Sequence, residues 1–163
     1  MKTLKIATRQ SPLALWQAEH IKQRLEQMYA DVHVELVTFV TQGDKILDTP
    51  LAKIGGKGLF VKELEAALLD GRADLAVHSM KDVPTALPIG IVQAAVLERA
   101  NTLDILVHKG NLDFLNGEGT IATGSLRRQA QWLNKYPNHK VVDLRGNVNT
   151  RMQKLQDSNW SGA

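Results

Sequence analysis

Three times in this chain, a short apolar segment with strand character is followed at once by a turn and a residue that favours the start of a helix. The apolar segments are residues 4–8, 120–123 and 140–144, and the helix-starting residues near their ends are Ser11, Ser125 and Asn147. Serine and asparagine cap helices well because their side-chain oxygens accept hydrogen bonds from the free N–H groups of the first turn. Strands that alternate with helices build parallel sheets covered by helices, so the pattern predicts an α/β fold.

The remaining periodicity predicts more elements of the same two kinds. Helices are expected over residues 12–29 and 60–68, and strands over residues 32–40, 73–78, 89–97 and 104–108. A polar, glycine-containing loop is expected over residues 41–58. The pattern pauses near residues 98–102, which predicts an N-terminal α/β domain over residues 1–98 and a second α/β domain over residues 103–163.

Composition narrows the class of protein. Hydrophobic residues make up 44% of the chain, which is enough for a packed core and argues against disorder. The formal charge of +3 and the pI near 9.2 favour anionic partners, among which nucleic acid, a membrane surface and small carboxylates stay open. The absence of cysteine excludes disulfides and thiolate metal sites within these residues. The first ten residues lack the apolar core of a signal sequence, and no apolar run approaches the roughly 20 residues that span a bilayer, so we expect a soluble, cytoplasmic protein.

Arginine lies at each of the three strand-to-helix junctions. The residues concerned are Arg9, Arg127, Arg128, Arg145 and Arg151. Two adjacent arginines in the first turn of a helix oppose the helix dipole at a cost of about 0.3–1 kcal/mol each, which a bound anion would offset. The arginine fork binds a carboxylate through two parallel hydrogen bonds. We therefore expect several anion pockets that face one cleft; solvated arginines on amphipathic helices are the alternative.

The segment of residues 73–85 combines a strand with an acid. Its apolar first half predicts a buried strand, and Lys81 and Asp82 follow at the edge where α/β sheets bind ligands. Pro84 disfavours a helix there. A carboxylate among cations stays ionised, so Asp82 is suited to stabilise a cationic intermediate and to relay protons. The alternative is a solvated loop with two charges. The five histidines lack zinc-site spacing and are interpreted as structural.

Five ordered segments carry a resemblance to a known family. They are ATRQSPLALWQA at residues 7–18, DTPLAKIGGKGLFVKELE at 48–65, AVHSMKDVPT at 76–85, GSLRRQAQ at 124–131 and LRGNVNTR at 144–151. Together they resemble the porphobilinogen deaminase (hydroxymethylbilane synthase) family from about residue 4 to the end of the chain. The resemblance implies a transferase of tetrapyrrole and haem biosynthesis, which joins four porphobilinogen molecules head to tail into hydroxymethylbilane with loss of ammonia. It also implies two doubly wound, mixed-sheet domains like those of periplasmic binding proteins, no metal, and a dipyrromethane cofactor on which the product grows.

The resemblance implies roles for individual residues. Asp82 matches the catalytic aspartate. Residues expected to hold the acetate and propionate groups of the cofactor are Lys81, Thr123, Ser125, Arg127, Arg128, Arg145 and Gly146. Residues expected to hold the incoming or growing pyrroles are Arg9, Ser11, Arg145 and Arg151. Lys53, Lys57 and Phe60 are expected to belong to a flexible loop that covers the cleft.

The chain departs from the family pattern at two places and in its extent. Ala122 and Gly124 stand where glycine and serine are expected, which puts one minor hydrogen bond in doubt. The family cofactor is attached through a cysteine of a third domain, whereas this chain has no cysteine. We therefore expect a catalytically inactive fragment, with a first domain that lacks its returning segment and an incomplete second domain. The full-length family is expected to be monomeric, whereas an exposed sheet edge favours self-association of the fragment.

Two other functions compete with this interpretation. A carboxylate-binding, solute-binding domain without catalysis is the main alternative. An RNA-binding protein is the third, but aromatic residues make up only 5% of the chain, and the expected stripe of aromatic and basic residues is missing. We therefore expect a small-molecule partner, porphobilinogen, and neither a nucleic-acid nor a membrane partner.

Overall fold

The computed structural model describes residues 1–46 and 58–163. These residues form two compact units, the first made of residues 1–46 and 58–96 and the second of residues 97–163. The elements of the first unit are β1 (Lys2–Arg9), α1 (Pro12–Met28), β2 (Val32–Phe39), α2 (Gln42–Lys45), α4 (Lys62–Leu69), β3 (Leu75–Ala76) and a 3₁₀ turn (Met80–Asp82).

β1 is the central strand of the first sheet, in which the strand order is β2-β1-β3. Both neighbours run parallel to β1, with Ile6 beside Leu36 on one side and beside Leu75 on the other. Because the strands are parallel, their carboxyl ends lie at one edge of the sheet. The turns that follow β1, β2 and β3 therefore leave from the edge at which α/β proteins bind ligands.

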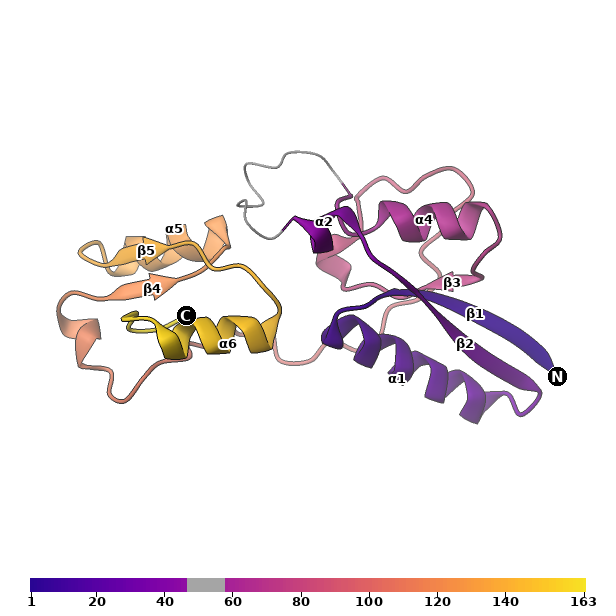
Figure 1. Ribbon diagram of the computed structural model, residues 1–163, viewed down its shortest axis with the longest axis horizontal. Coiled ribbons are helices and arrows are strands. Elements are labelled where there is room, and N and C mark those ends of the chain that lie inside the picture. Colours follow the sequence, from indigo (N-terminus) through magenta and orange to yellow (C-terminus); the bar gives the residue numbers. More distant parts are fainter. Residues whose placement is uncertain (47–57) are drawn as a thin grey trace. The chain divides into compact units, whose positions relative to one another are not determined.

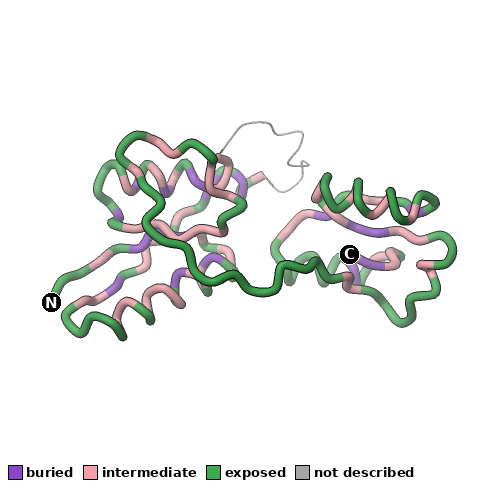
Figure 2. Tube along the Cα trace, turned by 180° about the vertical axis from the view of Figure 1, so that it is seen from behind, coloured by how far each residue is buried: buried purple, intermediate pink, exposed green. Residues whose placement is uncertain are grey.

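The two faces of this sheet bury different side chains because successive strand residues point to opposite sides. Ile6 packs with Ala18 of α1, whereas Ala7 packs with Leu64 and Ala67 of α4. Figure 1 shows α1 and α4 on the two sides of the sheet. All five side chains are fully buried, and Figure 2 shows buried positions along the strands and the inner faces of the helices.

The second unit repeats the strand-to-helix pattern in a smaller sheet. Its elements are a 3₁₀ turn (Asp113–Asn116), β4 (Thr120–Ala122), α5 (Leu126–Lys135), β5 (Lys140–Val142) and α6 (Val148–Asp157). β4 and β5 are parallel, and α5 and α6 lie on opposite sides of them (Figure 1). Gly162 extends the sheet because it bridges Ile121 in parallel and His108 in antiparallel orientation.

Several elements differ from those predicted. The strand predicted over residues 89–97 is absent, and residues 92–105 form a continuously exposed segment (Figure 2). The strand predicted over residues 104–108 is reduced to one bridge at His108. An apolar pattern is not sufficient for a strand, because the backbone also needs a neighbour with which to pair, and no such neighbour lies beside residues 89–97 in the described part of the chain.

Two further predictions change in detail. The strand predicted over residues 73–78 is shorter and comprises only Leu75–Ala76. The predicted loop over residues 41–58 begins with the short helix α2, and Met80–Asp82 forms one 3₁₀ turn despite the nearby proline. A three-residue turn ends before Pro84 and so avoids the clash that the proline ring would cause in a longer helix.

The predicted fold class is confirmed as mixed α/β with parallel sheets. The three predicted N-caps are also confirmed, since Ser11, Ser125 and Asn147 each accept a backbone N–H from the first turn of the helix that follows. No helix among the described residues is both long and apolar enough to cross a bilayer.

Candidate functional site

The first candidate site lies where β1 passes into α1. Arg9 is the last residue of β1, and Ser11 caps α1 by accepting the backbone N–H of Ala14 at 3.4 Å. Pro12 takes the first helical position, where its fixed φ suits the helix and its missing N–H costs nothing. This local sequence turns the chain tightly and leaves the Arg9 side chain at the ligand-binding edge of the sheet, with only 19% of it exposed.

Arg9 is held from three directions. Its Nε donates to Oδ2 of Asp44 at 3.1 Å and its Nη2 donates to Oδ1 of the same residue, so the pair is bidentate. Its Nη1 lies 3.9 Å from Oδ2 of Asp82, and its Cζ lies 4.3 Å from the ring centroid of Phe60. The guanidinium is thus fixed in plane by a carboxylate and covered on one face by an aromatic ring.

Asp44 is in turn fixed by the start of α2. The backbone N–H and the hydroxyl of Thr41 both donate to Oδ2 of Asp44, at 3.2 and 2.7 Å. Burial raises the pKa of the Asp44 carboxyl, but the hydrogen bonds from Arg9 and Thr41 and the charge of Arg9 outweigh burial and lower this pKa. Asp44 is therefore a stable anion in the folded protein.

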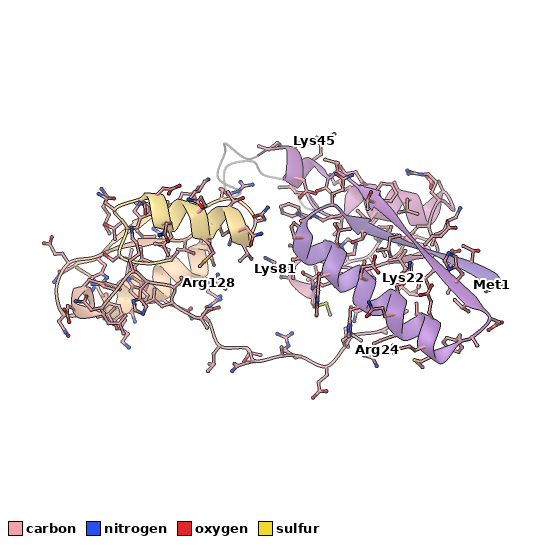
Figure 3. The ribbon with its side chains drawn as sticks, turned by 60° about the horizontal axis from the view of Figure 1, so that its bottom comes forward. Met1, Lys22, Arg24, Lys45, Lys81 and Arg128 are labelled. Carbon is pink, nitrogen blue, oxygen red and sulfur yellow. The ribbon has the colours of Figure 1, made fainter. Side chains whose placement is uncertain are left out.

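Asp82 lies in a cavity of about 30 Å³ at the same edge of the sheet, which Arg9, Ser11, His78 and Ser79 also line. The pKa of the His78 imidazole is lowered, chiefly because the ring is buried. The charge of Asp82 opposes this shift, and the charge of Arg9 adds to it. Lys81 is exposed on the same 3₁₀ turn, and Figure 3 labels it. The structure therefore brings Arg9, Ser11 and Asp82 together.

The second candidate site lies where β4 passes into α5. The hydroxyl of Thr123 accepts the backbone N–H of Ser125 at 3.2 Å, and Ser125 caps α5 by accepting the N–H of Arg128 at 3.4 Å. Asp104 joins the two arginines, since its Oδ2 is 3.0 Å from Nη2 of Arg127 and its Oδ1 is 2.8 Å from Nη2 of Arg128. The hydrogen bonds from Arg128 and Arg127 lower the pKa of Asp104.

A third junction, between β5 and α6, adds two arginines to this site. Gly146 has a φ of +121°, and its carbonyl accepts Nε of Arg151 at 2.7 Å. Burial lowers the pKa of the Arg151 guanidinium, and the positive charges of Arg128 and Arg145 lower it further. The structure thus brings Arg128 and Arg145 within electrostatic reach of Arg151, so the site attracts anions.

A cavity of about 420 Å³ lies beside this cationic cluster. Ile121, Trp132 and Leu144 contribute apolar surface to it, and Arg128 and Arg151 contribute positive charge. An apolar wall with a few cations suits a ligand that has an apolar body and carboxylate groups.

Two residues of these sites were not predicted from the sequence, and two predicted residues lie outside the described part of the chain. Asp44 and Asp104, the carboxylates that pair with the arginines, were not identified as site residues. For Asp44 a signal was present, because Thr41 and Asp44 have the spacing of a capping box. Lys53 and Lys57 lie outside the described residues, whereas Phe60 lies against Arg9. Among the residues that the structure describes, no group of three or more His, Cys, Asp or Glu could hold a metal ion.

The fold and these sites define the class of the protein: a parallel α/β protein with arginine-rich, anion-binding geometry where its strands pass into helices. Residues 4–163 match the family model described as "Porphobilinogen deaminase, dipyromethane cofactor binding domain". The chain therefore belongs to the porphobilinogen deaminase family, and the resemblance inferred from its five sequence segments is confirmed.

Two curated relatives illustrate the match. A porphobilinogen deaminase from Nitratidesulfovibrio vulgaris is 57% identical over 162 residues, which are 98% of this chain and 51% of the relative. A porphobilinogen deaminase from Dichelobacter nodosus is 56% identical over 157 residues, which are 95% of this chain and 52% of the relative. The chain thus spans about half the length of these curated relatives.

Proposed function

We propose that this chain supplies the carboxylate-binding residues and the catalytic acid of a porphobilinogen deaminase. That enzyme would be a transferase that joins four porphobilinogen molecules into hydroxymethylbilane and releases ammonia. The observation that carries the proposal is the position of Asp82, a carboxylate with 18% of its side chain exposed that lies 3.9 Å from Arg9 at the ligand-binding edge of a parallel sheet. The membership of the chain in the family supports the same reaction.

Asp82 acts on the reacting pyrrole in this proposal. Loss of ammonia from porphobilinogen leaves a cationic carbon, which a nearby carboxylate stabilises. The same carboxylate accepts the proton that the pyrrole ring loses when the new carbon–carbon bond forms. Arg9 and Ser11 line the cavity beside Asp82 and are suited to bind a substrate carboxylate.

The second unit fits the polar arms of a dipyrromethane cofactor. Arg128 and Arg151 border a cavity with apolar walls, and Thr123 lines the same cavity. Burial and, after it, the positive charges of Arg128 and Arg145 lower the pKa of Arg151, and carboxylates bound among these arginines would offset the repulsion. We propose that Arg127, Arg145, Ser125 and Gly146 complete this site in the second unit. For Lys81, which is exposed in the first unit, a role in binding a cofactor carboxylate is proposed from the family resemblance alone. When bound, such a cofactor supplies the pyrrole carbon to which new units are added.

Three further features belong to the proposal. We assign residues 1–98 and 103–163 to two domains of the periplasmic-binding-protein kind, supported by helices on both sides of each parallel sheet. Arg145 is assigned to the growing pyrroles as well as to the cofactor, and Arg151 is assigned to the growing pyrroles. The cytoplasmic location and the lack of nucleic-acid and membrane partners stay predictions from the sequence.

A chimaeric enzyme tests the proposed function. In it, this chain replaces the segment that it matches in the Nitratidesulfovibrio vulgaris relative, with which it is 57% identical. We expect the chimaera to consume porphobilinogen and to release ammonia. A chimaera that folds and binds porphobilinogen but releases no ammonia would contradict the proposal and favour a solute-binding role.

A further inference from the structure

The bond pattern of Arg9 divides its donors between two carboxylates. Asp44 engages Nε and Nη2, which are the donors on one edge of the guanidinium fork. Nη1 alone is left toward Asp82, and its distance of 3.9 Å from Oδ2 exceeds that of a hydrogen bond. Arg9 therefore forms a long ion pair with Asp82 without a hydrogen bond to it.

Asp44 can hold Arg9 in this way because its own position is fixed by a short local motif. Thr41 is fully buried, and both its backbone N–H and its hydroxyl donate to Oδ2 of Asp44. Asp44 is the third residue of α2 and accepts these bonds as the acid of a capping box. The position of the carboxylate is therefore held by bonds that do not depend on Arg9.

The ring of Phe60 restricts Arg9 from a second direction. It lies over the guanidinium, and Gly43 provides the space for it, because a Cβ at Gly43 would lie 2.1 Å from Cε1 of Phe60. The backbone N–H of Gly43 also donates to the carbonyl of Leu59 at 2.9 Å, which ties α2 to the segment that carries the ring. The motif around α2 thus controls both the edge and one face of the guanidinium.

We propose that Asp44 is a positioning residue that keeps Arg9 from closing onto Asp82. The inference rests on the proposed function, in which Asp82 must accept a proton and face a cation. A close, hydrogen-bonded ion pair with Arg9 would occupy the lone pairs of Asp82 and hold its charge. Asp44 binds the same guanidinium more closely and so leaves Asp82 available, while Nη1 of Arg9 stays directed toward the cavity.

The first test needs only this chain and no substrate. The Nε–H signal of Arg9 in a ¹H–¹⁵N NMR spectrum reports its bond to Asp44. We expect slow hydrogen exchange of this signal in the wild type and at least tenfold faster exchange in Asp44→Asn. A tenfold change in exchange corresponds to about 1.4 kcal/mol. Glu63→Gln is the matched control, because Glu63 accepts the backbone N–H of Gln42 at the same end of α2 without bonding Arg9.

The second test uses the chimaera described above. Asp44→Asn is expected to lower kcat by about tenfold to a hundredfold, the size of effect that misplacement of a reacting group produces, with a smaller change in KM. Glu63→Gln is expected to leave kcat within about twofold, because the glutamine oxygen can still accept the Gln42 N–H and Glu63 does not bond to Arg9. Thr41→Val, which removes only one hydrogen bond to Asp44, is expected to give an intermediate loss.

The outcomes separate the two proposals. Unchanged exchange of the Arg9 signal and unchanged kcat in Asp44→Asn would overturn the positioning role. Equal losses of kcat in Asp44→Asn and Glu63→Gln would also overturn it, because α2 would then act only as a structural element. If the wild-type chimaera shows no turnover, the proposed function fails, and the NMR comparison still decides whether Asp44 positions Arg9.

Discussion

Replacement of Arg128 by leucine tests the carboxylate-binding role of the second unit. Nη2 of Arg128 lies 2.8 Å from Asp104, and the side chain lines the large cavity with 49% of its surface exposed. A hydrogen bond to a charged group contributes about 1.5–3 kcal/mol. Because Arg128 is half exposed and already has a carboxylate partner, we expect the lower end of this range. The Kd of porphobilinogen, which carries the same acetate and propionate groups as the cofactor, is then expected to rise about tenfold.

Arg127 provides the contrast within the same helix turn. It also pairs with Asp104, but it does not line the cavity and is more exposed. We therefore expect Arg127→Leu to weaken binding by no more than about threefold, in the range of an exposed ion pair. Arg128→Lys should restore binding only in part, since lysine keeps the charge and loses the planar fork.

The assay is an NMR titration of this chain with porphobilinogen, followed through backbone amide shifts at residues 123–128. Arg24→Leu is the matched control, because it removes the same charge from α1, in the first unit (Figure 3). If Arg128→Leu and Arg24→Leu bind porphobilinogen equally well, the reasoning about Arg128 is refuted.

Three other predictions follow from the structure. Asp82→Asn in the chimaera should lower turnover by about 10²–10⁴-fold while the circular dichroism spectrum is unchanged, and near-normal turnover would exclude its catalytic role. Leu64→Ala, at a fully buried position, should lower the free energy of unfolding by about 2–5 kcal/mol in a urea titration. Leu69→Ala on the same helix, at a position that is 56% exposed, should cost less than about 0.5 kcal/mol, and equal losses would contradict the described packing. The pKa of Asp44 is lowered on folding, so its contribution to stability is complete above the unfolded value of about 4 and is lost as the pH falls through the folded value. The difference in unfolding free energy between wild type and Asp44→Asn should therefore shrink below about pH 4, and a constant difference down to pH 3 would disagree with this sign.

The strand-to-helix junctions could be predicted from the sequence because the interactions that form them join residues close together in the chain. Ser11, Ser125 and Asn147 cap helices through bonds to residues three positions away, so the pattern that predicts the helix also contains its cap. The prediction of a strand over residues 89–97 was wrong because a strand depends on a distant pairing partner, which a local sequence pattern does not contain.

The same distinction explains which site residues were found. Arginine at a helix start is a local signal, and it identified Arg9 and Arg128. Their carboxylate partners are distant in sequence, with Asp44 lying 35 residues from Arg9 and Asp104 lying 24 residues from Arg128. Nothing in the sequence around Asp104 indicates this pairing, because it arises only when the chain folds back on α5.

The central claim is that the strand-to-helix junctions of this chain bind the carboxylates of a pyrrole. The most direct measurement compares two NMR titrations of the chain, one with porphobilinogen and one with its dimethyl ester, which keeps the ring and removes both negative charges. We expect the amide signals near Arg9, Arg128 and Arg151 to shift with the free acid and not with the ester. Equal shifts with both compounds, or shifts with neither, would contradict this claim.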